Sequence, residues 1–208
     1  MPLVDTPKLT DQAWSWLYDY IALPHPQLGR KGAVCPFVQP ALNAGSLRLE
    51  QWEVSHAASE EELGAMVDRM AEVVVQGQWG GSNPTLRSLV VVVAGLEPER
   101  HRLLDRVQNA AKPGLVSRGL MLGQFHADCD DRAVRNPDFR VSRAPLPMLA
   151  LRYMAFHDVL FLHEDAQLFA SYRERFGDRY TRGSVTDALF IDLFEAAAQR
   201  WADHKETR

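Results

Sequence analysis

The segment from Gly123 to Pro145 gathers several kinds of side chain that take part in chemistry. It reads GQFHADCDDRAVRNPDFRVSRAP and places His126 and Cys129 three residues apart. Neutral imidazole is a good ligand of iron and zinc, and it also serves as a general base. One interpretation of His126 is therefore a metal ligand or a general base. The alternative is a structural histidine at a strand end, followed by a solvated acidic turn. A structural zinc site needs four ligands, and this pair supplies two.

Arginines form the second group of candidate residues. A guanidinium offers a planar fork that matches a carboxylate or a phosphate, so several arginines at the mouth of a pocket would hold an anion such as a haem propionate. Local salt bridges to aspartates of the same segment are the competing interpretation. Arg152 interrupts the apolar run MLALRYM, where a buried charge requires a partner or a ligand. The arginines concerned are Arg132, Arg135, Arg140, Arg143 and Arg152.

Further residues carry ligand atoms. Cys35 lies in the Pro-containing segment AVCPFVQPAL, where its thiol faces a cavity, binds a soft metal or packs. Packing is favoured because buried cysteine commonly behaves as a small hydrophobic residue. His56 and His157 each follow a predicted strand, so either could replace His126 as a metal ligand, and His56 is the main rival.

Several functional classes are excluded or disfavoured by the sequence. It contains no Gly-x-Ser-x-Gly elbow, no phosphate loop and no Gly-x-Gly-x-x-Gly after a strand. The net charge of −4 gives no general reason to expect nucleic acid or an acidic membrane surface as a partner. The N-terminus lacks the pattern of a secretory signal, and the longest apolar run, residues 89–96, is far shorter than the roughly 20 residues of a membrane span. We expect a reduced, cytoplasmic protein.

The candidate residues require a scaffold of alternating helices and strands. Apolar residues at helical spacing follow Thr10, Ser59 and Pro98, and two more amphipathic helices are predicted after Glu164. Runs of β-branched or alternating apolar residues predict strands at 47–54, with a bulge, and at 86–96, 119–125 and 147–156. The candidate histidines and arginines then lie in loops that leave strand ends, where rigid scaffolds commonly present functional groups.

The order of these elements indicates an α+β fold. A mixed, mostly antiparallel sheet of about four to five strands would pack against the helices. A chain of 208 residues with 46% hydrophobic residues is long enough for one core, which predicts a single domain over residues 1–208. The C-terminal tail, about residues 202–208, is expected to be disordered.

Three motifs of this chain resemble those of a family of small bacterial proteins: GAVCPFVQPAL, RNPDFRVSRAPLPMLALRYM and HDVLFL. In that family a Cys-Pro-Phe segment accompanies an Arg-Asn-Pro-x-Phe-x-x-x-Arg-x-Pro-x-Pro segment. More distantly, the layout is similar to the YqcI/YcgG family, whose members include haem-dependent N-oxygenases of natural-product biosynthesis. In this resemblance His126 matches a loop histidine, Ser142 and Arg143 match a Ser-Arg pair, and Arg152 matches a strand arginine. Cys35 and Pro36 reverse the Pro-Cys order of that family.

The resemblance implies a haem-dependent monooxygenase that oxidises a nitrogen of an amino acid or a related small amine. Haem iron would be bound by His126, or alternatively His56. Arg135, Arg140 and Arg143, with Cys35, would surround the cofactor. Asp158 would orient the amine near the iron, and Arg152 is the second expected catalytic residue. A non-catalytic haem or small-ligand binding protein is the alternative, and a homodimer is compatible with either function.

Overall fold

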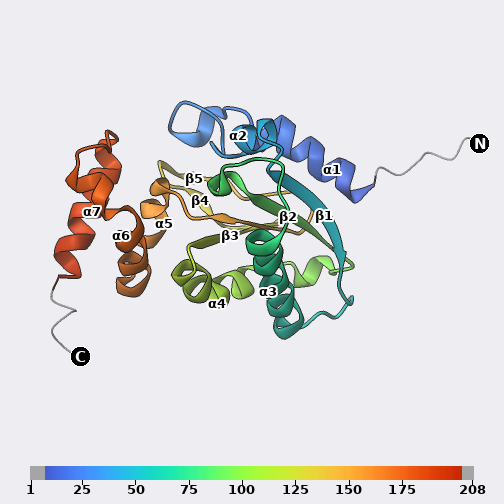
Figure 1. Ribbon diagram of the computed structural model, residues 1–208. Helices are drawn as coiled ribbons and strands as arrows, with labels where there is room; N and C mark the ends of the chain where they lie inside the picture. The colour runs from blue at the N-terminus through green and yellow to red at the C-terminus, as the bar shows by residue number, and fades with distance from the viewer. Residues whose placement is uncertain (1–7, 203–208) are drawn as a thin grey trace, which may run out of the picture. The chain divides into compact units, whose positions relative to one another are not determined.

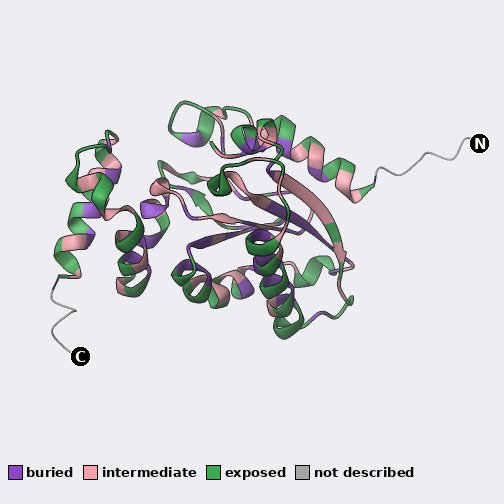
Figure 2. Cartoon of the chain, in the orientation of Figure 1, coloured by how far each residue is buried: buried purple, intermediate pink, exposed green. Residues whose placement is uncertain are grey.

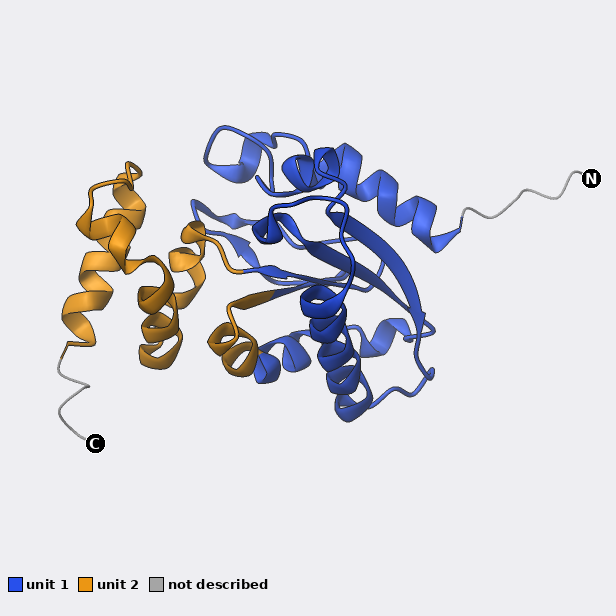
Figure 3. Cartoon of the chain, in the orientation of Figure 1, with its two compact units in different colours: residues 1–111, 122–153 blue, residues 112–121, 154–208 orange. Residues whose placement is uncertain are grey.

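The computed structural model describes residues 8–202, and the predicted disordered tail lies largely outside them. The chain divides into two compact units, whereas the sequence predicts a single domain (Figure 3). Unit 1 comprises residues 1–111 and 122–153, and unit 2 comprises residues 112–121 and 154–208. The predicted α+β class with a mixed sheet is confirmed (Figure 1). No helix within residues 8–202 is long and apolar enough to cross a membrane.

Four strands form the main sheet, in the order β1-β2-β6-β3. Strand β1 runs parallel to β2, and β2 runs antiparallel to β6. The pairing of β1 with β2 is unbroken over seven residues, so the predicted bulge in β1 is wrong. The strands are β1 (Leu47–Glu53), β2 (Ser88–Ala94), β3 (Leu120–Phe125) and β6 (Met148–Tyr153).

Helices cover both faces of this sheet. In Figure 1, α1 and α2 lie on one face and α3 and α4 on the other. Val90, Val92 and Met148 pack with α1, whereas the alternate residues of β2 point to the opposite face and are also buried (Figure 2). Ser59 caps α3, the helix predicted to follow it, by accepting a hydrogen bond from the backbone N–H of Glu62. These helices are α1 (Leu9–Trp16), α2 (Val38–Asn43), α3 (Glu60–Gln76) and α4 (Leu103–Ser117).

Short elements connect the larger ones. A π-helical turn, η1 (Leu17–Ile21), continues α1. The segment after β3, expected to be irregular, contains a two-stranded antiparallel sheet of β4 (Arg132–Ala133) and β5 (Asn136–Arg140). Three 3-10 turns each begin with proline, which suits the first turn of a helix: η2 (Pro26–Leu28), η3 (Pro84–Leu86) and η4 (Pro98–Arg100).

Unit 2 contains its own aromatic core. The hydroxyl of Tyr172 lies 2.5 Å from the carbonyl oxygen of Phe156 and 2.7 Å from the hydroxyl of Tyr180. Phe169 and Phe194 pack around the buried Tyr172 ring. The two predicted C-terminal helices are present. The elements of this unit include η5 (Phe156–Asp158), α5 (Val159–Leu162), α6 (Ala166–Thr181) and α7 (Ala188–Arg200).

Candidate functional site

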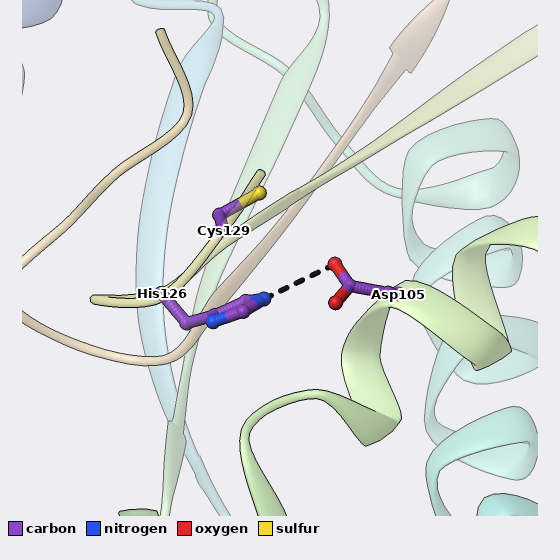
Figure 4. Close-up of side chains that lie close together, drawn as sticks. All are labelled: Asp105, His126 and Cys129. Atoms are coloured by element: carbon purple, nitrogen blue, oxygen red, sulfur yellow. Dashed lines mark hydrogen bonds and ion pairs between the residues drawn. The ribbon is translucent and has the colours of Figure 1, made fainter. Parts of the chain in front are cut away.

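His126 lies at the end of β3 and faces helix α4. Its side chain is fully buried, and its Nε2 lies 3.1 Å from Oδ1 of Asp105 (Figure 4). Gln124, two residues earlier and therefore on the same face of the strand, also donates to Asp105, at 3.4 Å. The end of β3 and the first turn of α4 are thereby joined by two polar contacts to one carboxylate.

Cys129 enters the same cluster from the turn that follows β3. The backbone N–H of Cys129 donates to the carbonyl oxygen of His126, which closes the turn and directs the thiol inward. Ligand atoms of Asp105, His126 and Cys129 all lie within 4.8 Å of one another. Burial raises the pKa of the Cys129 thiol to about 11, so the metal-free thiol is protonated at neutral pH and is a poor nucleophile.

A second carboxylate lies beside the cluster. The Gln124 amide donates to Oδ2 of Asp131 at 2.9 Å, and the Ser142 hydroxyl lies 3.5 Å from the same oxygen. Desolvation of the Asp131 carboxyl group, followed by repulsion from Asp105, raises its pKa. The carboxylates of Asp105 and Asp131 place negative charge beside the His126 imidazole, and this charge favours a cation at the cluster.

His126 also retains an unsatisfied polar atom. Its Nδ1 is buried and has no hydrogen-bond partner among the described residues. An unpaired buried polar group costs about 1–3 kcal/mol.

Another imidazole borders the cluster. The ring centroid of His101 lies 6.3 Å from that of His126, and the His101 Nε2 lies 3.3 Å from the carbonyl oxygen of Leu96. Burial lowers the pKa of His101, which favours its neutral form. Sequence reasoning missed both His101 and Asp105. No spacing signal links them to His126, because the fold brings them together across more than 20 residues.

The predicted arginines do not meet at His126. Arg140 and Arg143 line a groove with Trp16 and Tyr20, on the face of the sheet covered by α1. Arg135 lies in the turn between β4 and β5. Two further arginines contact neighbouring groups of unit 1. The Nη1 of Arg132 donates to the Pro137 carbonyl, and Arg152 donates to the Tyr153 carbonyl and lies 4.6 Å above the ring of Phe37.

The other predicted site residues have separate surroundings. Cys35 is half-buried and packs against the apolar cluster under α1, and neither cysteine is in a disulfide. His56 is exposed in the turn after β1. Asp158 belongs to unit 2, where its buried carboxylate accepts a hydrogen bond from the backbone N–H of Ala155. That contact stabilises the start of η5.

The surroundings of His126 do not fit haem. A haem ligand needs a ring nitrogen that opens onto space for a large macrocycle, yet the His126 side chain is wholly buried against Asp105. His126 does not line the groove that carries Arg140 and Arg143. The same residues do fit a single small ion, because three different ligand atoms converge there.

Residues 10–187 match a family described as Domain of unknown function (DUF6875). The chain belongs to this family. No curated protein and no solved structure matches it. The resemblance to the YqcI/YcgG family therefore stays a prediction.

Proposed function

We propose that the protein binds one divalent transition metal ion, with Zn²⁺ as the best match, through Asp105, His126 and Cys129. The observation that carries this proposal is the convergence of carboxylate, imidazole and thiol atoms within 4.8 Å of one another in a largely buried site. Ligand atoms around tetrahedral zinc lie about 3.5 Å apart, given zinc–ligand bonds of 2.0–2.3 Å. Only small movements of these side chains would complete the geometry.

The donor set favours zinc over the alkaline-earth ions. Thiolate and imidazole are soft or borderline ligands that suit zinc, cobalt and iron, whereas Mg²⁺ and Ca²⁺ prefer oxygen alone. A dication would neutralise the charge that builds up around Asp105, Asp131 and an ionised Cys129. It would also stabilise the thiolate, which burial otherwise disfavours.

Neighbouring residues support the candidate ligands. The Gln124 amide bonds to the carboxylates of both Asp105 and Asp131 and so orients the Asp105 side chain. Partners of this kind commonly fix metal ligands and tune their basicity. The Asp105 side chain is 31% exposed, which gives an ion a route into a site whose other two ligands are fully buried.

Three protein ligands leave one position of a tetrahedral ion for water. This pattern is typical of zinc sites that activate water, whereas structural sites use four protein ligands. We propose that neutral His101, whose ring centroid lies 6.3 Å from that of His126, would accept a proton from such a water. The proposal is therefore a metal centre with an open position, and hydrolysis is the class of reaction that it suits.

Titration of metal-free protein with Co²⁺ tests this function. Co²⁺ replaces zinc in tetrahedral sites, and its bond to a thiolate produces a charge-transfer absorption in the near ultraviolet. We expect this absorption to saturate at one ion per chain, to disappear on addition of Zn²⁺, and to be absent from Cys129→Ala. The variant Cys35→Ala, which removes the other thiol, should titrate like the unaltered protein. Saturation without the thiolate absorption, or absorption that persists in Cys129→Ala, would refute the proposed ligands.

The haem-dependent oxygenase inferred from the resemblance remains a prediction. So do an amine substrate, a non-catalytic role in haem binding and a homodimer. No contact within residues 8–202 favours one of them. The metal centre is the function that these contacts support best.

A further inference from the structure

We infer that a second site, on the opposite face of the sheet from Asp105 and His126, binds a small monocarboxylate that carries a flat apolar group. The site is a groove of about 490 Å³, lined by aromatic rings and by two arginines. Pockets for small molecules usually measure about 300–1,000 Å³. All of its lining residues belong to unit 1, and none of them takes part in the proposed metal centre.

One wall of the groove consists of aromatic side chains in fixed orientations. Trp16 packs edge-on against Phe125, with ring centroids 5.1 Å apart. The hydroxyl of Tyr20 donates to the carbonyl of Val141 at 2.9 Å, which ties η1 to the segment after β5. Phe139 stacks on His25 at 4.4 Å. Rings held in this way offer rigid faces and edges to a flat ligand at little entropic cost.

A π-helical turn brings Trp16 and Tyr20 to the groove together. The backbone N–H of Ala22 donates to the carbonyl of Leu17, five residues earlier, instead of the usual four. Turns of this kind are rare and occur frequently at functional sites. Tyr20 lies within this turn, and Trp16 directly precedes it; both side chains line the groove.

The arginines supply the charge for an anion. Arg143 is exposed, and its side chain forms no ion pair or hydrogen bond with another described residue. Arg140 is engaged only in part: one Nη donates to the Pro137 carbonyl, while its buried Nε lies 3.6 Å from Asp130, beyond hydrogen-bond length. A carboxylate matches the two-pronged geometry of a guanidinium such as that of Arg143.

The remaining charged residue of the groove limits the ligand's charge. Asp138 lines the same groove and is exposed. Its carboxylate repels any anion in the groove, and it repels a dianion about twice as strongly as a monoanion. The combination therefore favours a monocarboxylate over a phosphate dianion, and the aromatic wall favours one with a planar ring.

Isothermal titration calorimetry with a set of related probes tests this inference. Phenylacetate should bind saturably at millimolar concentration or below. Phenylacetamide, which lacks the charge, should bind at least about tenfold more weakly, since hydrogen bonds to charged groups are the strong ones. Cyclohexylacetate, with a puckered ring, and phenyl phosphate, with a second charge, should both bind more weakly than phenylacetate.

Two arginine variants locate the binding. Arg143→Gln should weaken phenylacetate by about tenfold or more, whereas Arg118→Gln, which changes an exposed arginine outside the groove, should not. Neither should alter the Co²⁺ titration, which confirms that the protein is folded and separates this site from the metal centre. Equal affinity for acid and amide, unchanged affinity in Arg143→Gln, or no saturable binding of phenylacetate would overturn the inference. Hemin binding that depends on Arg143, without binding of phenylacetate, would overturn it in favour of a porphyrin.

Discussion

Replacement of Cys129 by alanine should abolish the stabilisation of the protein by zinc. The Cys129 side chain is fully buried; its sulfur lies 3.9 Å from the carbonyl oxygen of Gln124 and also interacts with the backbone of Asp131. Loss of the sulfur from a packed site costs about 1 kcal/mol, because it leaves a small cavity. Without metal, the variant should therefore unfold only slightly below the temperature at which the unaltered protein unfolds.

Zinc should separate the two proteins. A ligand present at 100 times its dissociation constant stabilises the folded state by about 2.7 kcal/mol. For a chain of this size, 1 kcal/mol corresponds to a change in Tm of about 2–4 °C, so the unaltered protein should gain about 5–11 °C. Changes to residues that support metal ligands weaken metal binding by up to roughly 100-fold. Loss of a ligand itself should weaken zinc binding by at least this factor. At the same zinc concentration the variant then gains at most about 0.4 kcal/mol, or less than about 2 °C.

Differential scanning calorimetry with and without Zn²⁺ measures this difference. Cys35→Ala is the matched control, because it removes the other free thiol, which packs against the apolar cluster under α1. It should retain the full zinc-dependent rise in Tm. An equal rise in Cys129→Ala, or a rise lost in Cys35→Ala, would show that zinc stabilises the protein through other ligands.

Three further outcomes follow from the contacts of individual residues. Tyr172→Phe should lower the stability of unit 2 by about 1–3 kcal/mol, measured by chemical denaturation, because it leaves the Phe156 carbonyl and the Tyr180 hydroxyl without their shared partner. In native protein a thiol reagent should modify half-buried Cys35 before Cys129, because the raised pKa of Cys129 keeps its thiol protonated until the pH approaches about 11. Peptide mapping that finds Cys129 modified first would contradict this order. Saturating phenylacetate should change the affinity for Co²⁺ by less than about twofold, since the two sites share no side chain, and a larger change in parallel titrations would reveal coupling between them.

The scaffold was predictable because its elements are marked locally. The β-branched run at residues 90–93 became part of the central strand β2, and α3 starts at the Ser59 cap, where its apolar spacing begins. The hairpin within residues 132–140 was not predicted. Its strands are short and polar, so they lack the apolar alternation that identifies longer strands.

The candidate site was predictable only in part. His126 and Cys129 lie close in sequence, so their chemistry could be recognised. Asp105 could not be linked to them, because it lies on the helix predicted after Pro98, whose pattern is set by apolar residues such as the buried Leu103, Leu104 and Val107. A single sequence carries no pattern that shows which distant residue a polar side chain such as that of Asp105 will contact.

The arginines were grouped with His126 because they share one segment of the chain, but the strand geometry separates them. Successive side chains of a strand point to opposite faces. Gln124 and His126 therefore reach Asp105 on α4, while Phe125, between them, packs against Trp16 at the groove. The segment then returns alongside β3, where the backbone N–H of Ala144 donates to the carbonyl of His126. The backbone of Arg143 therefore lies beside that of His126, but the Arg143 side chain lines the groove on the opposite face of the sheet. One segment rich in ionisable residues thus supplies two sites of different chemistry.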